Sequence, residues 1–273
     1  MPQPAINIAI RGARAAARVL IRMLNRSEAL SVVEKQRNDF VSEADHAAEK
    51  AIIFEIQKAY PDHAVLAEES GYSGPEDAET VWIIDPLDGT RNYIQGLPHF
   101  AISIGIKTRG KLEHALVYDP TREEMFTASR GSGAYLNDHR IRVSNRTSME
   151  GALLATGFPF RAREALDDYM KMFRSVFAIA GDVRRAGSAS LDLAYVAAGR
   201  VDGFWEIGLK PWDVAAGALL VREAGGLCTD FDGADGFLDS GNIIAGNLKL
   251  AGQMKKTISP LFTGPLKALS GSA

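Results

Sequence analysis

Two acids follow an apolar segment in the stretch IIDPLDGTRNY, residues 83–93. Asp85 and Asp88 come directly after what the pattern predicts to be a buried strand. Burying charged groups is unfavourable unless another group compensates the charge. A metal, a phosphate site or a helix cap could provide that compensation, so this stretch is the first candidate for chemistry.

Acids also stand at three other places where predicted elements begin or end: Asp45, the pair Glu68 and Glu69, and Asp213 in PWDVAAG. Each has an ordinary explanation, as a helix cap or first-turn acid for Asp45 and Asp213 and as a solvated loop for the pair. The segment DPLDG could likewise be an ordinary turn. Taken together, however, carboxylates at the ends of adjacent strands can converge, and converging carboxylates repel unless cations lie between them.

The donor types favour a hard cation and a phosphate ester. Oxygen-only ligands suit Mg²⁺, and the sequence offers no competing cluster, since its five histidines and one cysteine are scattered. If a helix starts at Gly89 and Thr90, its free backbone N–H groups point toward the same place and offer an anion site. Metals beside an anion site indicate phosphate-ester chemistry.

Spacing separates this chemistry from other phosphatase mechanisms. Two residues separate Asp85 from Asp88, whereas phosphatases that form an aspartyl phosphate use the spacing Asp-x-Asp. A cysteine phosphatase needs Cys-x5-Arg, and the corresponding position after Cys228 is Ala234. The sequence also contains no Gly-x4-Gly-Lys-Ser/Thr loop. With no covalent nucleophile evident, we predict direct attack by a metal-activated water.

Composition places these residues in an ordinary globular protein. The chain has 273 residues, 46% of them hydrophobic and 24% charged, which suits one large or two moderate domains. The formal net charge of −3 gives no overall field that favours nucleic acids or anionic membranes. A single cysteine excludes an intrachain disulfide framework, and no apolar run reaches the ~18 residues of a membrane-spanning helix. We therefore expect a cytoplasmic protein with no membrane partner.

Apolar periodicity predicts the elements that position the acids in the first half. Residues 1–26 resemble a transit peptide in composition, but four arginines at spacings of three and four predict an amphipathic first helix instead. A second helix is expected over residues 44–60, with Asp45 in its first turn. Strands are expected at residues 64–67, 81–84, 102–107, 113–118 and 124–128. This order favours two helices packed on an antiparallel-rich sheet.

The pattern changes after about residue 148 to alternating strands and helices, which predicts an α/β layer. Strands are expected at residues 153–156, 183–185, 203–206, 226–229 and 243–245. Helices are expected at residues 165–180, 190–198, 212–224 and near the C-terminus. We predict an N-terminal α+β half, residues 1–147, that carries most metal ligands, and a C-terminal α/β half, residues 148–273, that carries Asp213. Ligands should bind where the two halves meet.

Two long motifs, WIIDPLDGTRNY and PWDVAAGALLVREAGG, resemble those of the inositol monophosphatase family of Mg²⁺-dependent, lithium-sensitive phosphatases. The resemblance is broadest to the bacterial SuhB-type members. It includes NDFVSEAD, AEESG, LPHFAISIG, ATGFPF, GNIIAGN and the long run from RRAGSAS to LKPWD, and extends to about residue 250. It implies an α+β fold built as a layered α-β-α-β-α sandwich, two to three Mg²⁺ ions per site, and a homodimer.

The resemblance also implies a set of metal ligands and catalytic residues. Glu68, Asp85 and the carbonyl of Leu87 would hold one Mg²⁺, and Asp85, Asp88 and Asp213 would hold a second. A third, weaker ion would lie near Glu68. The implied catalytic residues are Thr90, Asp45 and Glu68, with Thr90 oriented by Asp45 to help activate water.

Substrate contacts are implied on both sides of these ligands. They are Asp88, the backbone N–H groups of Gly89 and Thr90, Ala189, Glu206 and Asp213. Lys35 and Glu69 would support the site from behind. Arg91 departs from the family pattern, in which many members carry a small polar residue. It follows Thr90 and could touch the site, but we expect it to point to solvent.

The implied reaction is hydrolysis of inositol monophosphate to inositol and phosphate. A sister substrate is the first alternative, such as fructose bisphosphate, phosphoadenosine phosphate or histidinol phosphate, although Glu206 and Ala189 favour a polyol monophosphate. A second alternative is a role in transcription antitermination, because SuhB-type proteins bind RNA polymerase and Nus factors. The arginines of the first helix, or Arg184 and Arg185, could make such contacts, although ordinary surface or dimer contacts are the preferred explanation for both.

Overall fold

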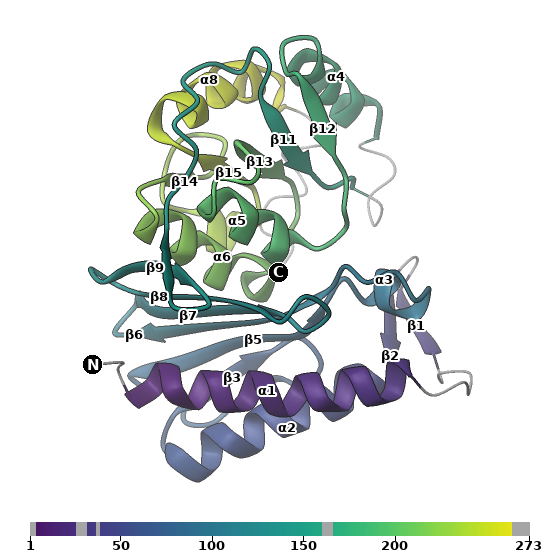
Figure 1. The fold of residues 1–273 in the computed structure, drawn as a ribbon, viewed down its shortest axis with the longest axis vertical. Coiled ribbons are helices and arrows are strands. Elements are labelled where there is room, and N and C mark those ends of the chain that lie inside the picture. The colour runs from purple at the N-terminus through teal and green to yellow at the C-terminus, as the bar shows by residue number, and fades with distance from the viewer. Residues whose placement is uncertain (1–3, 26–31, 37–38, 160–165, 264–273) are drawn as a thin grey trace.

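The computed structural model describes residues 4–25, 32–36, 39–159 and 166–263, and its elements form five layers in the order α-β-α-β-α (Figure 1). Two helices cover one face of a large sheet, two more separate that sheet from a smaller one, and a final pair covers the outer face of the smaller sheet. The predicted sandwich is therefore confirmed. Within the described ranges, no helix is long and apolar enough to cross a bilayer.

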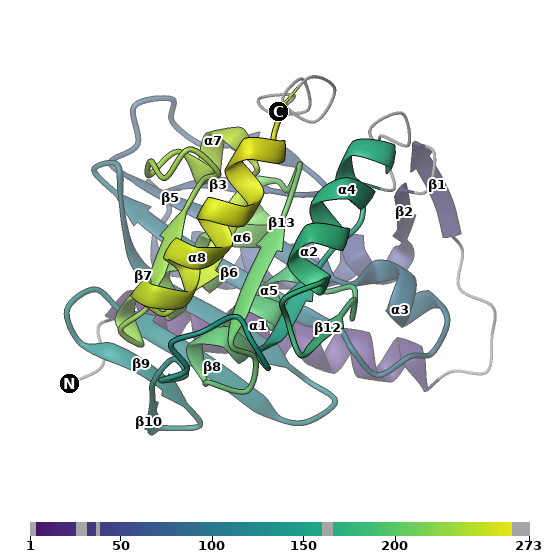
Figure 2. The same cartoon turned by 90° about the horizontal axis from the view of Figure 1, so that it is seen from above.

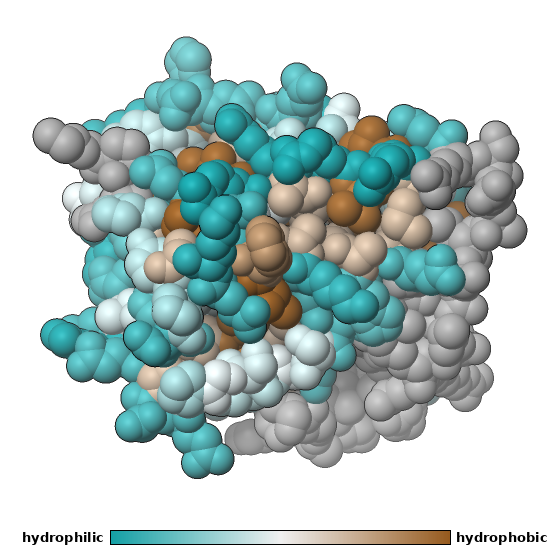
Figure 3. All heavy atoms as spheres, turned by 90° about the horizontal axis from the view of Figure 1, so that it is seen from below, coloured by the Kyte–Doolittle hydropathy of each residue, from teal (hydrophilic) through white to brown (hydrophobic). Residues whose placement is uncertain are grey.

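The first layer consists of α1 (Pro4–Leu24) and α2 (Glu43–Ala59). Small residues on the buried side of α1 allow the close approach, and a Cβ added to Gly12 would lie 3.3 Å from Ile52 Cγ2. The predicted arginine stripe lies on the opposite side of α1 and is exposed. Figure 3 views the molecule from below and shows hydrophilic side chains with small apolar patches between them. A hairpin of β1 (Val32–Gln36) and β2 (Asp39–Ser42), which the sequence did not predict, joins the two helices.

The large sheet has the strand order β10-β9-β8-β7-β6-β5-β3-β4. Its strands are β3 (Ala64–Ala67), β4 (Gly71–Ser73), β5 (Thr80–Asp88), β6 (Ala101–Thr108), β7 (Lys111–Asp119), β8 (Glu124–Ser129), β9 (Gly133–Leu136) and β10 (His139–Ile141). Neighbours pair antiparallel throughout, except for the parallel pair β3 and β5. The antiparallel-rich sheet is thus confirmed, while β4, β9 and β10 were missed.

The small sheet has the strand order β12-β11-β13-β15-β14. Its strands are β11 (Leu153–Thr156), β12 (Asp182–Arg184), β13 (Gly203–Glu206), β14 (Leu227–Thr229) and β15 (Ile243–Gly246). The helices of this half are α4 (Leu166–Phe177), α5 (Ala189–Ala197), α6 (Pro211–Glu223), α7 (Phe237–Ser240) and α8 (Leu248–Ile258). Figure 2 looks down on α4 and α8 above this sheet. The large sheet ends at Ile141 in sequence and the small one begins at Leu153, and the division at residue 148 stays a prediction.

The middle layer brings the two halves into contact because glycines allow its helices to approach closely. A Cβ on Gly105 of β6 would lie 2.9 Å from Ala215 Cβ of α6, and one on Gly217 of α6 would lie 2.5 Å from Leu193 Cβ of α5. The hydroxyl of Ser103 on β6 donates to the carbonyl of Trp212 at 3.0 Å. These contacts hold the first turn of α6 against the large sheet, next to the end of β5.

Candidate active site

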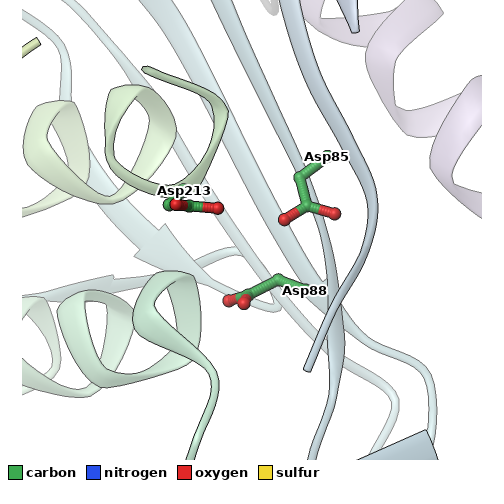
Figure 4. A group of neighbouring side chains, drawn as sticks. All are labelled: Asp85, Asp88 and Asp213. Carbon is green, nitrogen blue, oxygen red and sulfur yellow. The ribbon is translucent and has the colours of Figure 1, made fainter. Parts of the chain in front are cut away.

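Three carboxylates converge where β5 and α6 meet (Figure 4). Asp85 and Asp88 come from the end of β5 and Asp213 comes from the first turn of α6, and one oxygen of each lies within 4.8 Å of the others. The structure thus brings together three predicted metal ligands, although Asp213 follows the other two by more than a hundred residues of sequence. They line a pocket together with Glu68, which follows β3.

A bulge in β5 explains how Asp85 and Asp88 can face the same way. Side chains three positions apart in a regular strand point to opposite faces of the sheet. Here Asp85 pairs with Ser103 and Asp88 pairs with Ala101, so β5 contains one residue more than β6 between these pairs. The backbone N–H of Leu87 donates to Asp85 Oδ1 at 2.9 Å and stabilises the irregular segment.

The electrostatics of the cluster fit a hard cation. Burial of the carboxyl, followed by the negative charges of Glu68, Asp88 and Asp213, raises the pKa of Asp85 well above its ordinary value. A cation between these oxygens would reverse that effect, because it favours the charged form of each acid. The donors are carboxylate oxygens, which is the set that Mg²⁺ prefers.

Asp88 connects the cluster to the second half of the chain through one oxygen. Its Oδ2 accepts hydrogen bonds from Ser188 Oγ at 2.6 Å, Ser190 N at 2.7 Å and Ser190 Oγ at 2.5 Å. Both serines belong to the start of α5, and sequence reasoning gave neither of them a role. The signal that could have found them is the motif GSAS, which places two hydroxyls at a helix start.

Asp213 combines a structural contact with its place in the cluster. The backbone N–H of Lys210 donates to Asp213 Oδ2 at 2.7 Å, so the carboxyl also caps the beginning of α6. Pro211 occupies the first helical position, where the absence of a backbone N–H is tolerated. The helix-cap explanation is therefore confirmed for Asp213, and the metal-ligand role of the same side chain stays a prediction.

Thr90 and Asp45 lie side by side beneath the cluster. Thr90 Oγ1 lies 3.1 Å from Asp45 Oδ1 and 3.0 Å from the Leu87 carbonyl, so its one proton can be donated to either acceptor. Asp45 is fully buried at the start of α2. Gly89 has a φ of 93°, and a Cβ there would lie 3.0 Å from the His99 carbonyl. The helix that follows, α3 (Thr90–Ile94), has five residues, so the anion site we predicted depends on individual N–H groups and gains little from a helix dipole.

The predicted supporting residues have different outcomes. The backbone N–H of Glu69 donates to Glu49 Oε2 at 2.9 Å, and Glu49 is 3% exposed although sequence reasoning gave it no role. The side chain of Glu69 is buried, 3.9 Å from His46 Nδ1. Lys35 belongs to β1, and its side chain is outside the described part of the structure.

The opposite wall of the pocket comes from the second half of the chain. It contains Ala189 and Glu206, as predicted, and also Asp192, Arg185 and Gly157. A Cβ on Gly157 would lie 1.8 Å from Glu206 Oε1, so only glycine leaves room for that carboxylate. Arg91 is exposed and also lines the pocket, which agrees with the alternative that it could touch the site.

Known proteins are similar to this chain over nearly its whole length. The model of the inositol monophosphatase family matches residues 1–262. Nus factor SuhB of Pseudomonas aeruginosa is 55% identical over 269 residues, covering 97% of this chain and 99% of that protein. The structure of the extragenic suppressor protein suhB from Bartonella henselae gives a TM-score of 0.91 at 44% identity, covering 94% of this chain and 98% of that one. Inositol monophosphatase from Anabaena gives 0.83 at 38% identity, with 96% and 97% covered.

Proposed function

Because this chain belongs to the inositol monophosphatase family, we propose that it is a Mg²⁺-dependent, lithium-sensitive phosphatase that hydrolyses inositol monophosphate to inositol and phosphate. The observation that carries the proposal is the convergence of Asp85, Asp88 and Asp213 within 4.8 Å in one pocket. Repelling carboxylates that are held this close, with a raised pKa at Asp85, form a site whose charge a divalent cation compensates.

The acids divide into two overlapping ligand sets. One Mg²⁺ would be held by Glu68, Asp85 and the Leu87 carbonyl. A second would be held by Asp85, Asp88 and Asp213, and a third would bind weakly near Glu68. Bound Mg²⁺ would supply Lewis-acid chemistry that activates water and stabilises the leaving oxygen. The protein contributes the fixed orientation, since Asp85, Asp88 and Asp213 are each held by a backbone N–H donor.

Thr90 and Asp45 would remove a proton from the attacking water. When Thr90 Oγ1 donates to Asp45, which lies 3.1 Å away, its lone pairs are available to accept a hydrogen bond from water in the pocket. Asp45 is fully buried and cannot contact the water directly, so the Thr90 hydroxyl would pass the proton from the water to Asp45. Glu68, on the neighbouring strand end, would orient the same water.

The substrate would span the pocket between its two walls. The backbone N–H groups of Gly89 and Thr90 would bind the phosphate, and Ala189 and Glu206 would contact the polyol hydroxyls, together with Asp88 and Asp213. Glu69, Glu49 and Lys35 would support the acids from outside the pocket. The carboxylate of Glu206 over Gly157 supports a hydroxyl-rich leaving group, because a carboxylate accepts hydrogen bonds from hydroxyls.

Phosphate release tests this proposal directly. Inositol 1-phosphate would be incubated with the protein in Mg²⁺, in EDTA, and in Mg²⁺ with added Li⁺. We expect release that requires Mg²⁺ and falls with Li⁺. Release from fructose bisphosphate, phosphoadenosine phosphate or histidinol phosphate, with none from inositol 1-phosphate, would assign the sister substrate instead. No release from any ester by folded protein would contradict a phosphatase.

We also propose that the chain binds Nus factors or RNA polymerase, alongside catalysis. The observation that favours this role is the 55% identity to a protein named Nus factor SuhB. The exposed arginines of α1 offer one contact surface, whereas Arg185 lines the pocket and Arg184 pairs with Asp182. A pull-down with Asp85→Asn separates the roles, since binding should survive the loss of turnover. A cytoplasmic homodimer is part of the same proposal, and light scattering would measure its mass.

A further inference from the structure

Asp192 is a buried acid in the pocket wall that the proposed reaction does not use. It belongs to the first turn of α5, is 3% exposed, and lines the pocket together with Glu206. Its backbone N–H donates to the Ser188 carbonyl, so its position follows from the same helix start that binds Asp88. The residue is therefore fixed relative to the proposed metal ligands.

The charges that face Asp192 come from three different elements. Glu206 at the end of β13 and Asp88 at the end of β5 are acids, and Arg185, which precedes α5, is the basic group. Burial of the carboxyl, followed by the negative charges of Glu206 and Asp88, raises the pKa of Asp192, and Arg185 acts in the opposite direction. This end of the pocket thus holds two neighbouring carboxyl groups that repel each other.

Asp192 differs from other buried acids of the chain in its hydrogen bonding. Asp88 Oδ2 accepts three hydrogen bonds, and the carboxyl of Asp119, fully buried, accepts four from Thr121 and Arg122. Within the described residues, no donor lies within hydrogen-bonding distance of the Asp192 carboxyl. Its oxygens are not among the buried side-chain atoms that lack a partner, so they are accessible from the pocket, where a donor can complete their hydrogen bonding.

We propose that Asp192 and Glu206 form a polyol-binding pair, in which each carboxyl accepts a hydrogen bond from a hydroxyl of the substrate. This inference rests on the proposed function and assigns a further specificity-determining residue to it. Hydroxyls are neutral donors, so they can add a hydrogen bond to each acid without adding charge. A second phosphate on the substrate would be repelled by the pair, so the site selects polyol monophosphates over bisphosphates.

Three variants test the pair. Asp192→Leu removes both acceptors, Asp192→Asn keeps the shape and one acceptor, and Asp239→Asn is the matched loss of an exposed carboxylate on α7. Inositol 1-phosphate would be compared with p-nitrophenyl phosphate, a monoester without hydroxyls, in the presence of Mg²⁺. We expect Asp192→Leu to raise KM for inositol 1-phosphate about 10- to 100-fold, Asp192→Asn to raise it less, and Asp239→Asn to leave it unchanged.

The selectivity between substrates distinguishes recognition from a structural role. KM for p-nitrophenyl phosphate should stay within about threefold of wild type in every variant, and the preference over fructose 1,6-bisphosphate should fall in Asp192→Leu. The melting temperature of Asp192→Leu should not decrease, because a buried acid without a donor does not stabilise the fold. A lower melting temperature of Asp192→Leu, together with equal increases in KM for inositol 1-phosphate and p-nitrophenyl phosphate, would overturn the inference.

The two proposals fail in different ways. If wild-type protein hydrolyses inositol 1-phosphate and Asp192→Leu keeps its KM, the polyol-binding pair is wrong and the phosphatase proposal stands. If wild-type protein hydrolyses p-nitrophenyl phosphate and leaves inositol 1-phosphate untouched, the polyol substrate and the pair are both wrong.

Discussion

Replacing Asp88 with asparagine tests the metal proposal while the shape of the site is kept. Asparagine offers one acceptor oxygen and one amide donor in place of two acceptor oxygens. Three donors from Ser188 and Ser190 converge on Asp88 Oδ2, so the amide would turn its oxygen toward α5. Its NH₂ group would then face Asp85 and Asp213, where the proposed Mg²⁺ needs an oxygen ligand.

The expected magnitudes follow from these contacts. A hydrogen bond to a charged acceptor contributes about 1.5–3 kcal/mol, and one to a neutral acceptor about 0.5–1.5 kcal/mol. Making the three bonds from Ser188 and Ser190 neutral therefore lowers the free energy of unfolding by about 3 kcal/mol or more. The same change removes one of the negative charges around Asp85, which opposes this loss when no metal is present. We therefore expect a small change in metal-free stability. The turnover number should fall at least about 100-fold. Replacing a residue that only supports a metal ligand already lowers metal affinity or activity 10- to 100-fold.

Thermal unfolding with increasing Mg²⁺ separates the two effects. Wild-type protein and the Asp239→Asn control should melt at higher temperature as Mg²⁺ rises, since a ligand that binds the native state stabilises it. Asp88→Asn should keep a cooperative transition near the metal-free wild-type temperature and lose most of the Mg²⁺-dependent increase. An unchanged increase together with near-wild-type turnover would refute the assignment of Asp88 as a ligand.

Four further predictions concern the same pocket. The raised pKa of Asp85 means that the metal-free native state binds its proton more tightly than the unfolded chain does. In EDTA this residue should therefore make the free energy of unfolding fall as pH rises from about 4 through the raised native pKa. Melting temperatures at pH 5 and pH 7 check this, because Asp85→Asn should lose this part of the pH dependence. Lithium should inhibit turnover competitively with Mg²⁺ in the tens of millimolar, a rough scale for a weak hard-cation site, and insensitivity would count against the three-carboxylate geometry. Gly157→Ala should displace Glu206 and raise KM for inositol 1-phosphate, with p-nitrophenyl phosphate as the unaffected comparison. Thr90→Val should lower turnover about 100-fold and leave the Mg²⁺-dependent melting increase in place, because the pair with Asp45 acts on a proton and not on the ion.

Sequence patterns predicted elements well where burial alone determines them. The strands 153–156 and 203–206 have the predicted bounds, and α2 differs by one residue at each end. The missed hairpin has strands of only four residues in β9 and three in β10, so periodicity gives it little signal. Its turn holds Asn137 and Asp138, both at positive φ, and that residue pair could have indicated it.

The bulge in β5 could not be predicted from the alternation of residue types. The strand was expected to end at residue 84, where the apolar run ends, and Pro86 is unusual inside a sheet. In the structure β5 continues to Asp88, and the extra residue lies where Asp85 and Asp88 must face one pocket. Sequence reasoning therefore named both acids and missed the irregularity that brings their side chains together.

The convergence of Asp213 with the two β5 acids depends on packing that no spacing in the sequence shows. It requires the glycine contact between β6 and α6 and the three hydrogen bonds from the start of α5 to Asp88. Because one oxygen of Asp88 holds α5 and its carboxylate also belongs to the metal cluster, the position of α5 and that of the cluster are linked. Asp192 is on α5 as well, so the proposed polyol pair and the proposed metal site are held by the same helix start. A change that displaces the start of α5 as a whole, such as loss of the hydrogen bonds to Asp88, should therefore affect substrate recognition and metal binding together.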